Sequence, residues 1–170
     1  MKIKIPKNIV SDCENFATKV IGTNIDKYRL RRQSDASLIR KQIVQGKLAE
    51  YAVYLMFDKR CKAPDLTVYD KLKKSFDADL EFGNIRFHVK SQSKESEQRY
   101  SRSWVFQSED PLFKENSSND LCVFCVVDGD LVDICLIKKF KNIKFGDPKL
   151  IKFKGIKKMV YYEDNSCILD

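Results

Sequence analysis

Hydrophobic and polar positions alternate most regularly between Phe76 and Gln92 (FDADLEFGNIRFHVKSQ). The alternation runs on both sides of Gly83-Asn84, as in two half-buried strands joined by a tight turn. We therefore predict strands at about 77–82 and 85–91. Because successive side chains of a strand point to opposite faces, the pattern predicts a carboxylate row near a basic row. The rows are Asp77, Asp79 and Glu81 on the first strand, and Arg86, His88 and Lys90 on the second.

Two helices are predicted in the first third of the chain, a short one at about Lys7 to Ile21 and a long one at about Asp35 to Phe57. Ser34 or Asp35 is a suitable N-cap for the long helix, because its side chain can accept hydrogen bonds from the amides of the first turn. The long helix carries a broad apolar stripe. Its members are Leu38, Ile39, Val44, Leu48, Ala49, Ala52, Val53 and Met56.

The second half of the chain predicts further strands around an apolar run at Leu121 to Val127. Such a continuous run is typical of a central strand that is covered on both faces. The polar segment Ser93 to Ser103 predicts a mobile loop. Further strands are expected at about 104–107 and 131–137, with a last one or two within 160–169. The fold class is mixed α/β, with about five strands flanked by helices in a single domain of residues 1–170.

Composition favours one class of partner but does not establish it. The 170 residues carry a formal net charge of +8, and 33% are charged. This charge favours a polyanionic partner, but a basic protein without such a partner is equally compatible with it. No apolar run approaches the length of a membrane span, and the N-terminal residues lack the apolar core of a signal peptide. We therefore expect a cytoplasmic protein.

The six cysteines do not predict a metal site or disulfides. Cys122 and Cys125 form a single CxxC within the apolar run LCVFCVV. An offset of three residues on a strand points the two thiols to opposite faces, so they cannot easily share a metal. Reduced, buried, structural cysteines are the expectation for a cytoplasmic protein.

Basic residues gather in several segments. Residues 138–158 hold nine lysines and one acid, Asp147, with Phe140, Phe145 and Phe153 between them. We expect this amphipathic segment to pack and to present lysines to phosphates, although lysine runs are often simply solvated. Other candidate nucleic-acid contacts are Gln92, Lys94, Arg99, Arg102, Arg29, Arg31 and Arg32. For Gln92, an ordinary strand-end role is an equally good interpretation.

Three elements occur in an order that resembles the PD-(D/E)XK nuclease superfamily. They are Glu50 in the helical GKLAEYAVYLMF, Asp79 on a strand, and HVKSQ on the next strand. That superfamily has a helix glutamate, a strand aspartate and a (D/E)-x-K motif on a restriction-endonuclease-like fold. The resemblance covers about residues 36–137 and implies that fold, with the lysine-rich segment 138–158 following it.

The resemblance also implies a chemistry. Asp79 would bind Mg²⁺ (or Mn²⁺), Glu50 would bind the metal or a water, and Lys90 would orient the attacking water. Mg²⁺ prefers a few carboxylate oxygens plus water, and a lysine adds positive charge where negative charge develops. The implied activity is that of a metal-dependent DNA endonuclease of restriction, homing or phage type that hydrolyses phosphodiester bonds. By analogy, it would act on double-stranded DNA as a homo-oligomer.

His88 departs from this pattern, because it stands where the superfamily usually has an acid. It could be a nitrogen ligand that favours Mn²⁺, a proton carrier, or the mark of a site that binds DNA without cutting it. Asp77 shares the strand face of Asp79 and is the alternative metal ligand. The alternative functions are a catalytically silent nucleic-acid-binding protein that keeps the fold, and a housekeeping protein unconnected to nucleic acid.

Overall fold

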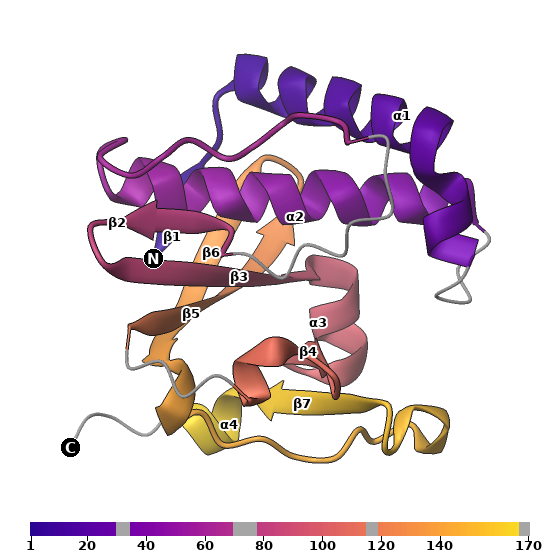
Figure 1. The fold of residues 1–170 in the computed structure, drawn as a ribbon, viewed down its shortest axis with the longest axis vertical. Helices are drawn as coiled ribbons and strands as arrows, with labels where there is room; N and C mark the ends of the chain where they lie inside the picture. The colour runs from indigo at the N-terminus through magenta and orange to yellow at the C-terminus, as the bar shows by residue number, and fades with distance from the viewer. Residues whose placement is uncertain (30–34, 70–77, 115–118, 167–170) are drawn as a thin grey trace.

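A five-stranded mixed sheet crosses the middle of the molecule, with two helices on one side and a smaller sheet on the other (Figure 1). The computed structural model describes residues 1–29, 35–69, 78–114 and 119–166. In the main sheet the strand order is β1-β6-β5-β3-β2. Its strands are β1 (Lys2–Lys4), β2 (Leu80–Phe82), β3 (Ile85–Ser93), β5 (Asp120–Asp128) and β6 (Leu131–Lys139). The α/β class and the sheet of about five strands are confirmed.

The two long helices form the layer above the sheet. Helix α2 (Ala36–Met56) packs on β3 and β5, and α1 (Lys7–Arg29) lies along α2 (Figure 1). The Asp35 carboxylate accepts hydrogen bonds from the amides of Ser37 and Leu38 at 2.9 and 3.0 Å, which confirms Asp35 as an N-cap. Helix α1 is longer than predicted, because its backbone stays helical through Gly22, a residue that weakens the helix signal in the sequence.

The predicted hairpin is present. Strands β2 and β3 pair in an antiparallel register that sets Leu80 opposite Phe87 and Glu81 opposite Arg86. Gly83 in the turn has φ +57°, a value that glycine adopts without a steric penalty. Strand β2 begins only at Leu80, and Asp77 lies outside the described residues. The hairpin therefore brings the start of β2 next to the middle of β3, where the candidate site residues lie.

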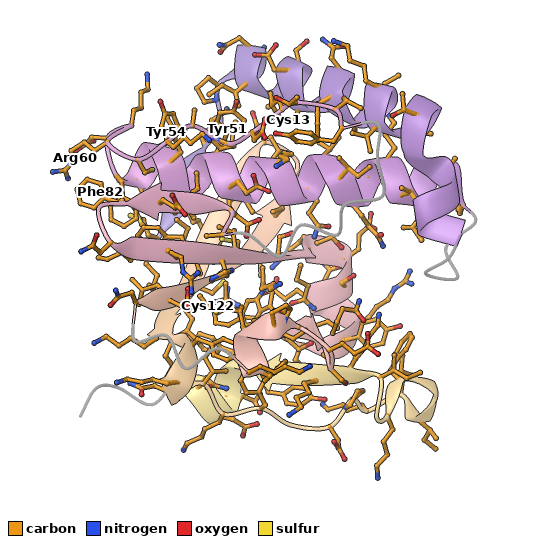
Figure 2. All side chains as sticks on the ribbon, in the orientation of Figure 1. Cys13, Tyr51, Tyr54, Arg60, Phe82 and Cys122 are labelled. Carbon is orange, nitrogen blue, oxygen red and sulfur yellow. The ribbon has the colours of Figure 1, made fainter. Side chains whose placement is uncertain are left out.

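Strand β5 is central, as predicted, and each of its faces is covered by a different cluster. The face toward α2 packs aliphatic residues around Phe87, Val123 and Cys125. The opposite face packs Cys122 against aromatic residues of the smaller sheet, and Figure 2 shows Cys122 on the side of β5 away from α2. The two thiols thus point to opposite faces, as their spacing predicted.

The smaller sheet pairs β4 (Ser103–Gln107) with β7 (Lys157–Tyr161). Strand β4 was expected from the sequence, but its place in a second sheet was not. In the lysine-rich segment, short 3₁₀ turns at Phe140–Asn142 and Ile151–Phe153 separate irregular stretches. Phe140 and Phe145 pack in the aromatic cluster with Phe106 and Phe113, which confirms that the segment packs.

The loop predicted at 93–103 was wrong, the last predicted strand was displaced, and strand β1 and a short C-terminal helix were missed. Residues 93–103 contain helix α3 (Lys94–Tyr100) instead of a loop, capped by Ser93, whose hydroxyl accepts from the Ser96 amide at 3.1 Å. No residue of α3 is buried, so the sequence lacks the apolar stripe that would have revealed it. The C-terminal strand begins earlier than expected and is followed by helix α4 (Tyr162–Asn165). Strand β1 was missed. Among the described helices, none combines the length and apolar character needed to cross a membrane.

Candidate active site

Glu50 lies in the buried half of α2, with 8% of its surface exposed. Its carboxylate accepts a hydrogen bond from the Lys47 ammonium, three residues earlier on the helix, at 2.7 Å. Burial raises the pKa of Glu50 to about 7, and the negative charge of Asp79 adds to the rise, whereas Lys47 opposes it. The charge of Glu50 is therefore not fully compensated by its ion pair with Lys47.

Asp79 lies directly before β2 and is bound to β3 through both its backbone amide and its carboxylate. Its amide donates to the Phe87 carbonyl at 2.9 Å, and its Oδ2 accepts from the Val89 amide at 2.7 Å. The residue is exposed at the surface, but its carboxyl group turns back against β3. Desolvation by the surrounding protein raises its pKa, against the opposing effects of the Val89 amide, Lys90 and His88.

The helix glutamate and the strand aspartate thus belong to one electrostatic group. Asp79 raises the pKa of Glu50, and both carboxyl groups are desolvated. Within the described residues, no group of three or more His, Cys, Asp or Glu side chains is arranged to hold a metal ion. Two carboxylates with excess negative charge nevertheless suit Mg²⁺ or Mn²⁺, which complete their coordination with water and substrate oxygens. The donor chemistry of Glu50 and Asp79 therefore fits a divalent cation.

Lys90 lies on the opposite face of β3 from α2. Its Nζ is 4.5 Å from the centre of the Phe106 ring and 3.9 Å from Oδ2 of Asp110. Its side chain is 28% exposed. Its positive charge lowers the pKa of Asp79. Lys90 therefore contacts Phe106 on one face of β3, whereas α2, which carries Glu50, covers the other face.

His88 is buried and bound to a second carboxylate. Its Nε2 lies 3.0 Å from Oδ1 of Asp120, a residue at the start of β5 with 1% exposure. An ionised carboxylate only accepts hydrogen bonds, so Nε2 is the protonated ring nitrogen. Arg86 donates two hydrogen bonds of 2.8 Å to the same Asp120 carboxylate. This group, Arg86, His88 and Asp120, we call the Asp120 cluster.

The candidate nucleic-acid contacts have different surroundings. Gln92 is buried, and its amide group binds the backbone of Ser101 and Ser103 at 2.9 and 3.1 Å. Lys94 and Arg102 both pair with Glu97, and Arg102 also pairs with Asp133. The remaining members are Arg99, which is exposed on α3, Arg29 at the end of α1, and Arg31 and Arg32 outside the described residues.

Three charged residues of the site escaped the sequence interpretation. Lys47 could have been found from its three-residue spacing to Glu50, which places both on one helix face. Asp120 gave no such local signal, because only the parallel pairing of β3 with β5 sets it beside Arg86. Asp110 is an N-cap, whose Oδ1 accepts a hydrogen bond from the Leu112 amide at 3.2 Å. Its Oδ2 lies 3.9 Å from the Nζ of Lys90.

Comparison of the chain with protein-family models, with curated proteins and with solved structures gives no significant match.

Proposed function

We propose that this chain is a metal-dependent DNA endonuclease of the PD-(D/E)XK type, with a restriction-endonuclease-like fold, that hydrolyses phosphodiester bonds of double-stranded DNA. One observation carries the proposal. Glu50 and Asp79 come from different elements, both have raised pKa values, and Lys90 lies within electrostatic range of Asp79. Acids with strongly shifted pKa values and a specific charged partner cluster at functional sites.

In this proposal Glu50 and Asp79 hold Mg²⁺ or Mn²⁺, which when bound supplies an activated water and positive charge. The Val89 amide fixes Asp79, so that its carboxylate is oriented before substrate arrives. Lys90 supplies a positive charge beside Asp79 and stabilises the negative charge that develops on the phosphate. Its partial exposure leaves the ammonium open to a DNA phosphate.

A second candidate is a catalytically silent nucleic-acid-binding protein, and the observation that favours it is the state of His88. The residue at the position of the motif acid is buried and its Nε2 is committed to Asp120. Without a third carboxylate, the site would hold a divalent cation more weakly than the family pattern implies. Binding would then rest on the exposed lysines of residues 138–158 and on Arg99.

The test compares wild type with Lys90→Ala on supercoiled plasmid, in Mg²⁺ and in Mn²⁺. We expect the loss of Lys90 to slow cleavage by about a hundredfold, because positive charge at the reacting phosphate is lost. Lys4→Ala is the control: Lys4 is an exposed lysine on β1, at the opposite edge of the sheet from β2. Equal cleavage by wild type and Lys90→Ala would refute the site.

The same assay separates the two candidates. Salt-sensitive binding of the plasmid without any cleavage supports the silent protein instead of the nuclease. His88→Glu restores the family's acid at that position, so a gain of cleavage over wild type shows that His88 is what limits the reaction. Light scattering of the purified protein with and without DNA tests the homo-oligomer that cutting both strands requires.

A further inference from the structure

Lys47 has a position that the proposed reaction does not explain. Its Nζ lies 2.7 Å from Oε2 of Glu50, and its side chain is only 18% exposed. On the side of α1, the same Nζ lies 5.6 Å from the centre of the Phe16 ring. Cys13 and Tyr51 mark this α1–α2 interface in Figure 2. A lysine that is mostly enclosed between two helices is costly unless negative charge surrounds it.

That negative charge comes from three segments of the chain. Against the effect of burial, Lys47 lowers the pKa of Glu50 on α2 and of Asp79 before β2. The third carboxylate, Asp65, follows α2, and its pKa is lowered to about 2 by hydrogen bonds from Tyr69 and Thr67, with a further contribution from Lys47. Of these carboxylates, that of Glu50, a proposed metal ligand, forms the ion pair with Lys47 at 2.7 Å.

We propose that Lys47 is an internal counter-cation, which neutralises the Glu50–Asp79 pair in the metal-free protein and moves away when a divalent cation binds. This inference rests on the proposed metal site. A divalent cation and the ammonium are attracted to the same Glu50 oxygen, and like charges at such a distance repel. The flexible four-carbon stem of lysine allows the ammonium to leave without a backbone change. Lys47 thereby stabilises the empty site and weakens its affinity for metal.

The experiment titrates MnCl₂ into the protein without DNA, by isothermal titration calorimetry. We expect Lys47→Met to bind Mn²⁺ about tenfold more tightly than wild type, because a positive charge near the metal is removed. Lys4→Met is the control. Lys4 pairs with Asp130 at 3.8 Å on β1, at the opposite edge of the main sheet from β2, so its loss leaves the Mn²⁺ affinity unchanged. Glu50→Gln identifies the site, because it weakens Mn²⁺ binding.

A second measurement needs no variant. Wild-type protein is treated with an amine-acetylating reagent, and the modification of each lysine is quantified by mass spectrometry. We expect Mn²⁺ to increase labelling of Lys47, since its ammonium is released, and to leave labelling of Lys4 unchanged. This readout remains decisive if Lys47→Met does not fold.

Unchanged or weaker Mn²⁺ binding by Lys47→Met, or labelling of Lys47 that does not respond to Mn²⁺, overturns the inference. If neither wild type nor Lys47→Met binds Mn²⁺, both the counter-cation and the metal site are refuted. Tighter binding by Lys47→Met in a protein that cleaves no DNA supports the counter-cation and refutes only the nuclease.

Discussion

Two groups of charged side chains lie beside β3, and they differ in how their charges balance. In the Glu50–Asp79 pair, Lys47 forms an ion pair with Glu50 at 2.7 Å, and burial together with Asp79 nevertheless raises the pKa of Glu50 to about 7. In the Asp120 cluster, by contrast, two partners converge on one carboxylate, with distances of 2.8 to 3.0 Å. Removing one partner of a buried ion pair is strongly destabilising, whereas acids with strongly shifted pKa values cluster at functional sites.

This difference bears on His88. The family pattern places an acid there, which would add a third carboxylate to the unbalanced group. In this chain the residue is instead part of the balanced group, because Asp120 binds its Nε2. We therefore expect substitutions in the Asp120 cluster to change stability, and substitutions in the acid pair to change metal and pH responses. Four predictions test this division.

The largest effect should come from removing the shared carboxylate. Asp120→Ala removes the carboxylate that binds both Arg86 and the buried His88 ring, and we expect a loss of about 3 kcal/mol in the free energy of unfolding. Urea denaturation measures it. Asp147→Ala is the control, because its ion pair with Lys154 at 3.7 Å is largely exposed and should contribute little. Similar losses in both variants would contradict the comparison.

Metal should act on the acid pair alone. At a Mn²⁺ concentration about a hundredfold above Kd, we expect the wild-type free energy of unfolding to rise by about 2.7 kcal/mol. Asp79→Asn should lose this gain, whereas Asp120→Asn should keep it despite its lower starting stability. Thermal denaturation with Mn²⁺ and with a chelator measures the difference. A gain that survives in Asp79→Asn would place the metal elsewhere.

The acid pair should also respond to pH. Burial and Asp79 raise the pKa of Glu50 from its ordinary 4.5 to about 7, so the unfolded chain gives up this proton at lower pH than the folded protein. The resulting stability is fully present below about pH 4.5 and is lost as the pH rises through about 7. Glu50→Gln has no carboxyl group to titrate and does not lose this stability. We expect its free energy of unfolding to exceed that of wild type by about 2 kcal/mol at about pH 8.

The measurement for Glu50→Gln is urea denaturation in a chelator at about pH 5 and about pH 8. At the lower pH the two proteins should be nearly equal. Glu163→Gln, which changes an exposed glutamate on α4, controls for the substitution itself. A Glu50→Gln variant that is less stable than wild type at the higher pH would show that the Lys47 pair outweighs the cost of burial.

The smallest effect should come from Arg86→Lys. Lysine keeps the charge but cannot make the two parallel hydrogen bonds that Arg86 donates to Asp120. Because the Arg86 side chain is 38% exposed, water offsets part of the loss, and we expect a cost of about 1 kcal/mol. Urea denaturation of Arg86→Lys and of Asp120→Ala under the same conditions tests which variant loses more stability. A cost equal to that of Asp120→Ala would make Arg86, and not His88, the partner that matters.

Features set by neighbouring residues could be predicted from the sequence. The Asp35 cap, the Gly83 turn and the opposite faces of Cys122 and Cys125 depend on spacings of a few residues, and all are present. Helix α3 could not be predicted in this way, because it lies on the surface without a buried residue. Its N-cap and the ion pairs of Glu97 stabilise it.

Features that depend on pairing between distant segments could not be predicted. Asp120 meets Arg86 and His88 only because β3 and β5 run parallel, about thirty residues apart along the chain. Strand β4 was recognisable from its composition, but its partner β7 lies more than fifty residues later. In the candidate site, Glu50, Asp79 and Lys90 could therefore be named from the sequence. Asp120, which binds His88, and Asp110, which lies beside Lys90, could not.

The single tryptophan of the chain gives an experimental consequence. Trp104 is 1% exposed, and its indole Nε1 donates to the Cys125 carbonyl at 2.9 Å, next to the irregular register between β5 and β6. Its intrinsic fluorescence therefore reports on the contact between the smaller sheet and β5. Far-ultraviolet circular dichroism, in contrast, is dominated by α1 and α2. Unfolding curves from the two signals that fail to coincide would show that the two sides of the main sheet come apart in separate steps.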